Sequence, residues 1–291
     1  MGRPSPTVRR RRLRSELRRL RAERGLTIED VQERTGGDIR ISTLSRWETG
    51  ERGIRPNDLR ALLDVYGLVD GEDRDALLAL CREAKERGWW QSYGSAVPGW
   101  FQFYLGLESE ASMIQEYSSE LVPGLLQTPD YYRAFLSTAP ADADISGKIE
   151  VRLARQERLT AADDPPEYWA VLNEGVIRRT VGPDGTMRAQ LDHLVELADL
   201  PNVTLQVLPF SAGVHPAMDG GFSTLGFPDP ATDPPVVYLE NTAGSVYLEE
   251  AADVDRFGRM FSHIIAKALS PEDSRKLLSV AAVGAGHDDH R

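Results

Sequence analysis

The chain has 291 residues and a formal net charge of −11, with 41% hydrophobic and 27% charged residues. This composition is typical of a globular protein of about two domains, and it excludes a disordered chain. No apolar run reaches the length of a membrane span, and no leader-like apolar segment follows the arginine-rich start. The single cysteine, Cys81, excludes an intramolecular disulfide and multi-cysteine sites. We therefore expect a cytoplasmic protein without membrane contact.

The charge is distributed unevenly along the chain. Residues 1–60 hold 16 arginines and no lysine against 9 acidic residues, a balance of +7, whereas the remaining residues have a balance of −18. Such asymmetry indicates a basic head for a polyanion such as DNA and an acidic body for a different task. On charge alone, a solvated basic N-terminus remains the alternative.

The head shows a succession of helical patterns. Apolar spacing predicts helices over residues 8–24, 28–35, 41–48, 56–66 and 72–88. Thr27 is a candidate N-cap of the second helix, and Gly36-Gly37 is a turn signal before the third. In the third helix Ile41, Leu44 and Trp47 are expected to face inward. Two short helices joined by a glycine turn and braced by neighbouring helices can present one helix to a major groove.

The motifs of this head resemble the lambda-repressor/Cro-like, or XRE, family of regulators. The resemblance is carried by Gly36 and by two strings, Leu26-Thr27-Ile28-Glu29-Asp30-Val31 and Ser42-Thr43-Leu44-Ser45-Arg46-Trp47-Glu48-Thr49-Gly50. The second string is similar to the recognition helix of that family. Two features depart from the family, because Gln32 replaces a small residue and the turn over residues 36–40 is longer.

The resemblance implies DNA contacts from the third helix and its surroundings. The candidate DNA-binding residues are Thr27, Arg40, Ser42, Thr43, Ser45, Arg46, Arg52 and Arg55. Hydroxyls and guanidinium groups can bond base edges or phosphates, and the amides at the start of the second helix can hold a phosphate. The arginines at residues 9–12, 14 and 18 are expected to add affinity through counterion release. Alternatively, Arg46 pairs with Glu48 or with another acidic residue inside the domain.

The body combines helices with short strands. Helical patterns cover residues 100–117, 145–159, 187–200 and 254–269, and β-branched or aromatic runs predict about five strands near residues 168–172, 203–208, 222–227, 236–240 and 245–248. The aromatic residues Trp89, Trp90, Tyr93 and Trp100 form either a patch where the domains dock or a ligand box. The fold class is therefore multidomain α+β: an N-terminal all-α, five-helix, lambda-repressor-like domain, then a larger helical and mixed-sheet α+β domain.

The body also resembles a known group of proteins. Strings over residues 88–93, 120–128, 152–156 and 200–210 are similar to the uncharacterised domain that follows the XRE-type head in WhiJ-like actinobacterial regulators. These regulators are described as paired with a small acidic protein encoded nearby, in a toxin–antitoxin-like arrangement. The resemblance implies a partner protein and no catalytic residues.

One loop of the body could carry chemistry. Residues 213–221 combine His215, Asp219 and flexible glycines after a strand. A metal needs three or more ligands and a nucleophile needs an activating neighbour, so a histidine that satisfies its own loop is the plainer interpretation. We expect no enzyme activity, no catalytic residues, no cofactor and no metal. If the sheet of the body and this loop bind a small molecule, the protein is a ligand-sensing regulator. If the main task of the protein is to bind and neutralise its neighbour, it is antitoxin-like.

The expected organisation places the helix-turn-helix domain at residues 1–68, a helical connector at 69–100, the regulatory domain at 101–280 and a polar tail at 281–291. We expect a homodimer on double-stranded DNA, because one recognition helix contacts too few bases. The protein would be associated with the nucleoid when it is bound to DNA.

Overall fold

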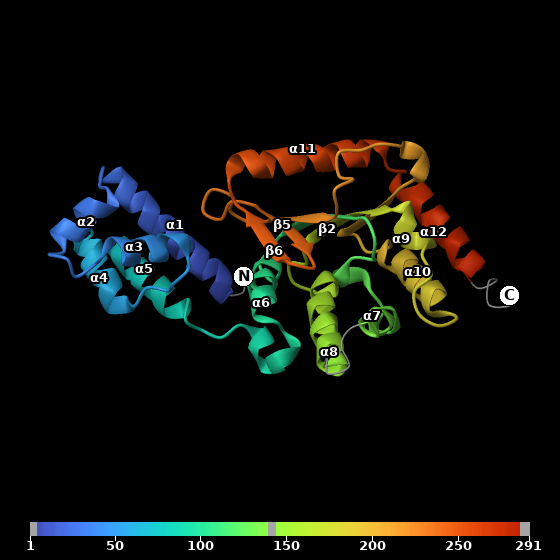
Figure 1. Ribbon diagram of the computed structural model, residues 1–291, viewed down its shortest axis with the longest axis horizontal. Helices are drawn as coiled ribbons and strands as arrows, with labels where there is room; N and C mark the ends of the chain where they lie inside the picture. Colours follow the sequence, from blue (N-terminus) through green and yellow to red (C-terminus); the bar gives the residue numbers. More distant parts are fainter. Residues whose placement is uncertain (1–4, 139–143, 286–291) are drawn as a thin grey trace. The chain divides into compact units, whose positions relative to one another are not determined.

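The structure is a computed structural model that describes residues 5–138 and 144–285. The chain divides into two compact units, residues 1–91 and residues 92–291 (Figure 1). The division lies inside the expected connector, within a 3-10 segment, η1 (Trp89–Ala96). None of the described helices is long and apolar enough to cross a bilayer.

The described part of the first unit contains five α-helices, as the apolar spacing predicts. They are α1 (Pro6–Glu23), α2 (Ile28–Arg34), α3 (Ile41–Thr49), α4 (Pro56–Val65) and α5 (Glu72–Glu83). Leu17, Leu44, Leu59 and Leu62 are among the residues of their shared core, each at most 1% exposed. Gly50, in the left-handed conformation at φ 84°, ends α3.

The inner face of α3 differs from the expectation at one position. Leu44 and Trp47 are buried, but Ile41 is 40% exposed and lies in the first turn of the helix. Its place in the core is taken by Ile39, which is 4% exposed and belongs to the turn before α3. The longer turn therefore supplies an apolar anchor of its own.

The only cysteine of the chain packs inside this unit. Cys81 on α5 is 1% exposed, and its thiol donates to the carbonyl of Ile54 at 3.5 Å. Burial raises the pKa of the Cys81 thiol. The thiol is therefore protonated and unreactive at neutral pH.

The second unit contains a six-stranded mixed sheet in its described residues, in the order β3-β2-β1-β4-β5-β6. Its strands are β1 (Met113–Ser118), β2 (Glu167–Asn173), β3 (Val203–Leu208), β4 (Phe222–Gly226), β5 (Val236–Asn241) and β6 (Gly244–Leu248). The first three strands are mutually parallel, and β4, β5 and β6 continue the sheet antiparallel.

The expected five strands and the helix over residues 100–117 need correction. Helix α6 (Gly99–Glu108) ends early, and residues 113–118 form β1 in the middle of the sheet. Residues 109–112 contain neither glycine nor proline, so no turn signal separates the helix from the strand. Pairing with β2 and β4 on both sides determines the conformation of β1.

The two faces of the sheet have different coverings (Figure 1). Helix α11 (Ala251–Lys267) covers one face, where Tyr117, Phe222, Phe257 and Phe261 belong to one buried cluster. The opposite face carries α6 together with helices α7 (Pro129–Leu136) and α8 (Ile145–Gln156).

The remaining described helices gather near β2 and β3. They are the 3-10 segments η2 (Gly124–Leu126), η3 (Glu157–Thr160) and η4 (Phe210–Ala212), and the α-helices α9 (Glu174–Arg178), α10 (Thr186–Leu197) and α12 (Pro271–Ala285). Helix α12 extends beyond residue 280, the expected end of the body, so the first part of the expected polar tail is helical.

Candidate nucleic-acid interface

The outward face of α3 carries polar side chains. Ser42, Arg46 and Thr49 follow each other at helical spacing and are exposed, opposite the buried Leu44 and Trp47. Arg46 Nε donates to the carbonyl of Ser42 at 3.1 Å, within the same helix. Among the described residues, no carboxylate pairs with Arg46. The guanidinium group is therefore available to a ligand outside the domain.

The other predicted contact residues surround this stripe. Thr43 and Ser45 are half-buried at the sides of α3, and Arg40, its N-cap residue, is exposed. Arg52 and Arg55 are exposed in the segment between α3 and α4. In the described part of the chain, none of these three arginines forms an ion pair. All the predicted contact residues except Thr27, the N-cap residue of α2, thus occupy α3 and the segments that flank it.

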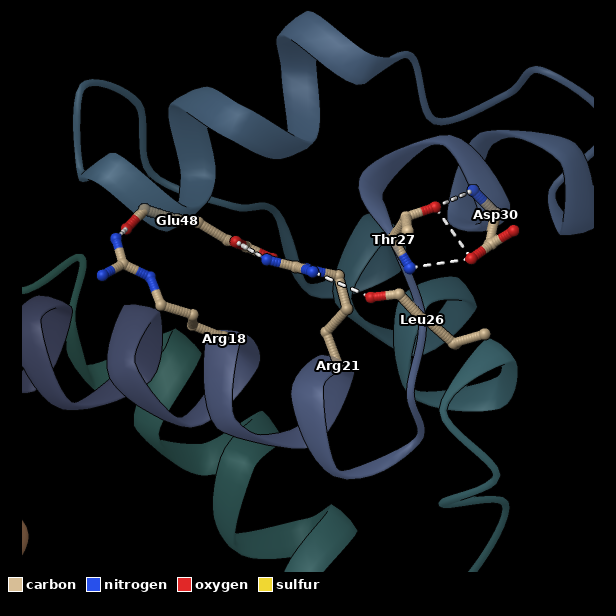
Figure 2. Close-up of polar contacts among 6 residues, drawn as sticks. All are labelled: Arg18, Arg21, Leu26, Thr27, Asp30 and Glu48. Atoms are coloured by element: carbon tan, nitrogen blue, oxygen red, sulfur yellow. Dashed lines mark hydrogen bonds and ion pairs between the residues drawn. The ribbon is translucent and has the colours of Figure 1, made fainter.

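A buried ion pair fixes the inner side of α3 to α1 (Figure 2). Arg21 donates from Nε and one terminal nitrogen to the two carboxylate oxygens of Glu48, at 2.7 and 2.8 Å. Its other terminal nitrogen donates to the carbonyl of Leu26 at 2.8 Å, and Arg18 donates to the carbonyl of Glu48 at 3.1 Å. The alternative in which Arg46 pairs with Glu48 is therefore wrong, because Arg21 occupies that carboxylate.

The electrostatics of this pair follow from its geometry. Hydrogen bonding to Glu48 raises the pKa of Arg21, so the guanidinium stays charged. Tyr66 is fully buried beside the pair, and burial raises the pKa of its hydroxyl. A planar, two-bond contact holds the helix in one rotation, which a single lysine contact does not do.

The turn between α2 and α3 is built from local hydrogen bonds and two left-handed glycines. Gly36 and Gly37 have φ values of 60° and 89°, which other residues rarely adopt. The Thr35 hydroxyl accepts from the amide of Ile39 at 3.3 Å. This turn positions Ile39 in the core.

Gln32 has a role that the sequence motifs do not reveal. Its side-chain oxygen accepts from the amide of Ile41 at 3.0 Å, so a residue of α2 caps the first turn of α3. The N-cap residue Arg40 makes no side-chain cap bond of its own. A small side chain at position 32 would leave that amide without this partner.

Thr27 is engaged in a capping box (Figure 2). Its hydroxyl accepts from the amide of Asp30 at 3.1 Å, and its own amide donates to the Asp30 carboxylate at 2.8 Å. The backbone bond from Thr27, followed by the bond from its hydroxyl, lowers the pKa of Asp30. The Thr27 side chain thus first stabilises the start of α2, where it is also exposed.

The arginines of α1 make contacts within the first unit. Arg9 donates to the carbonyl of Glu83 at 3.0 Å and to the carboxylate of Glu86 at 2.7 Å. Arg10 and Arg14 donate to the carbonyls of Ala84 and Thr49, at 2.8 and 3.1 Å. Together with Arg18 and Arg21, these side chains tie α1 to its neighbours. The basic charge of this helix therefore has a structural use beside any phosphate contact.

In the loop over residues 213–221 of the second unit, His215 and Asp219 have different surroundings. His215 is buried and lies with its Nε2 3.4 Å from the hydroxyl of Tyr117, whereas Asp219 is exposed. Burial lowers the pKa of His215, so the ring is neutral at pH 7. Among the described residues, no three His, Cys, Asp or Glu side chains gather as a metal site requires.

Two family models match the chain, one within each of its two compact units. A family model described as a helix-turn-helix domain matches residues 12–77. A second model, described as a domain of unknown function (DUF5753), matches residues 101–280, more than half of the chain. The chain belongs to the DUF5753 family. Its DUF5753 domain holds the mixed sheet, and the helix-turn-helix domain precedes it. No curated protein and no solved structure matches the chain.

The interface residues that sequence reasoning missed are those that position α3. Gln32 was visible only as a departure from the family motif, and Glu48 only as a possible partner of Arg46. The sequence did contain a signal for Glu48. It directly follows Trp47 on the side of α3 that is buried, and a buried carboxylate needs a cation beside it. Thr49 completes the exposed stripe and follows from the same spacing.

Proposed function

We propose that the protein is a sequence-specific, DNA-binding transcriptional regulator of the lambda-repressor-like type. The proposal is supported above all by the different surroundings of the two sides of α3. Its inner side is fixed by the pair of Arg21 and Glu48, while its outer side presents Ser42, Arg46 and Thr49. A helix held rigidly with exposed hydroxyl and guanidinium groups on its outer side is suited to read base edges in the major groove.

The surrounding arginines support a phosphate-binding role. Arg40 precedes α3, and Arg52 and Arg55 follow it, so cations flank the reading face at both ends. Phosphate contacts of this kind set the register of a protein on the duplex and make affinity steeply dependent on salt.

We further propose that the protein binds as a homodimer to a two-fold-related operator. Two recognition helices then contact half-sites about 34 Å apart, one turn of the double helix. Such a regulator would act in the cytoplasm, on the nucleoid. A sedimentation experiment that finds only monomers, both free and on operator DNA, would remove the dimer from the proposal.

For the DUF5753 domain we propose a regulatory and non-enzymatic role. Its resemblance to WhiJ-like regulators supports a small acidic partner protein that modulates DNA binding. His215 is buried beside the Tyr117 hydroxyl whereas Asp219 is exposed, and no bond joins their side chains among the described residues, which favours a loop without an acid–base pair. Co-expression with the neighbouring small acidic protein should change operator affinity; unchanged affinity and no co-purification would refute the partner.

The DNA-binding proposal is tested by titrating the full chain with its own upstream DNA and with scrambled DNA, at two salt concentrations. Arg46→Ala should lose about 1–3 kcal/mol of discrimination between the two DNAs. Arg82→Ala, an exposed arginine on α5, is the matched control and should behave as the wild type. If the wild type shows no preference for any DNA, or if Arg46→Ala keeps full discrimination, α3 does not read the sequence.

A further inference from the structure

A cavity in the second unit lies on the sheet face opposite α11. Its volume is about 260 Å³, it is open on one side, and it is lined by residues of the sheet and of helices α6, α7 and α8. A neighbouring hollow shares Glu116, Tyr132, Arg152 and Tyr238 with it. Concave sites with apolar walls and a few convergent polar groups are the usual places for small ligands.

The floor of the cavity is a polar row across the sheet. Glu116 on β1 lies opposite Ser223 on β4, which lies opposite Tyr238 on β5. Residues that pair across strands point to the same face, so the three side chains meet at the cavity. The hydroxyl of Tyr168 donates to Glu116 at 2.7 Å, and the hydroxyl of Tyr238 donates to Glu240 at 2.7 Å.

The walls of the cavity are aromatic. Phe101 and Tyr104 of α6 stack at 5.3 Å between ring centroids, and Tyr104 lies 4.3 Å from Tyr238. On the α7 side, Tyr132 and Phe135 stack at 6.4 Å. Such walls accept a flat apolar ring. Trp100 also lines the cavity, whereas Trp89, Trp90 and Tyr93 are not among its lining residues.

Two arginines of α8 reach the cavity, and they differ in their partners. Arg155 forms a buried, two-bond pair with Glu108, at 2.7 Å for each bond. Among the described residues, no carboxylate pairs with Arg152, whose guanidinium carbon lies 3.9 Å from the centre of the Tyr132 ring. A half-buried guanidinium without an anion is costly unless a ligand supplies one.

The chain makes room for Arg152. A Cβ atom at Gly124 would overlap the guanidinium of Arg152, so a larger residue there would force this guanidinium to move. Lys148 adds a second cation to the lining. Arg155 and Glu108 neutralise each other. When Glu116 is protonated, the positive charges of Arg152 and Lys148 exceed the single negative charge of Glu240, so the lining carries net positive charge.

We propose that this cavity binds a small aromatic carboxylate, whose anionic group pairs with Arg152 and whose ring lies against Tyr104 and Tyr132. The site is distinct from the loop over residues 213–221, because His215 of that loop contacts Tyr117 in the cluster that α11 covers. The inference does not depend on DNA binding, since the ligand contacts only the second unit.

Glu116 supports an anionic ligand. Burial raises the pKa of Glu116 to about 7, so a large fraction of this carboxyl is neutral at neutral pH and repels no anion. The titratable and charged groups around it come from β2, β5, α6, α7 and α8, and they are Tyr168, Tyr238, Glu240, Tyr104, Glu108, Tyr132, Lys148, Arg152 and Arg155.

The test uses the full chain and isothermal titration calorimetry with three probes of similar size. They are salicylate, the neutral salicylamide and the cation phenyltrimethylammonium. Salicylate should bind at least tenfold more tightly than either of the other two. Tighter binding of phenyltrimethylammonium, or no binding of salicylate, would overturn the proposal.

Variants locate the anion. Arg152→Gln and Gly124→Ala should each weaken salicylate binding at least tenfold, whereas Arg133→Gln, an exposed arginine on α7, should leave it unchanged. Circular dichroism and thermal unfolding show whether each variant keeps its fold. Wild-type affinity from Arg152→Gln would refute the pairing.

A measurement on the wild type alone keeps the proposal testable if the variants unfold. The affinity for salicylate should fall several-fold between pH 6 and pH 8, because Glu116 ionises while the ligand carboxylate stays charged. An affinity that is constant or rises over this range would contradict a carboxylate bound beside Glu116.

Discussion

Replacing Glu48 by glutamine tests whether the pair with Arg21 holds α3 in place. The variant keeps the size of the side chain and removes its charge, so Arg21 loses a two-bond ionic contact and keeps its bond to the carbonyl of Leu26. The side chains of Arg21 and Glu48 are 17% and 5% exposed. Breaking one partner of a buried pair costs about 3–5 kcal/mol, and glutamine can retain one of the two bonds. We therefore expect the free energy of opening of the first unit to fall by about 2 kcal/mol.

Amide hydrogen exchange, followed by peptide on the full chain, measures this free energy separately for each unit. Peptides from α1 and α3 should exchange faster, whereas peptides from the sheet of the second unit should not change. Glu51→Gln is the control, because Glu51 is exposed just after α3. If Glu48→Gln and Glu51→Gln both change exchange by less than about 0.5 kcal/mol, the pair does not hold the helix.

Three further predictions follow from other contacts. Gln32→Ala should remove the cap on the Ile41 amide, lower stability by about 1 kcal/mol in urea unfolding, and reduce operator affinity; unchanged values for both would show that this cap is dispensable. Gly37→Ala should destabilise the first unit by about 1 kcal/mol in the same assay, because φ is 89° there, and a neutral effect would contradict the need for glycine. Glu116 has a raised pKa, so it stabilises the fold at low pH and loses this contribution as pH rises through about 7. Between pH 4.5 and 7.5 the wild type should lose about 1–3 kcal/mol of unfolding free energy, and Glu116→Gln should flatten this dependence in a pH series of thermal unfolding; equal slopes would refute it.

The helices of the first unit could be predicted because local signals agree with the tertiary structure. Thr27 caps α2, Gly50 ends α3, and the spacing of Leu44 and Trp47 matches a helix that buries one side. Ile41 has the same spacing and is nevertheless exposed, since the turn supplies Ile39 to the core instead. The periodicity of apolar residues identifies the inner face of a helix, but it does not show at which residue the neighbouring helices stop covering that face.

The sheet and the cavity depend on contacts between residues far apart in the sequence. Strand β1 contains Gln115 and Glu116 and follows a helix without a turn signal, so only its pairing with β2 and β4 makes it a strand. The cavity depends on the same strand, because Glu116 belongs to its floor. Arg152 and Gly124 come together from separate elements, and no sequence spacing relates them.

The buried thiol of Cys81 makes the chain well suited to site-directed labelling. Because this cysteine is protonated and packed against Ile54, a maleimide reagent should find no accessible thiol in the native protein. One introduced cysteine, for example in Glu33→Cys at an exposed position of α2 outside the candidate contact residues, would then be the single reactive position on each copy. In the proposed dimer, a pair of spin labels attached there would report the separation of the two helix-turn-helix domains on DNA without any cysteine having to be removed first.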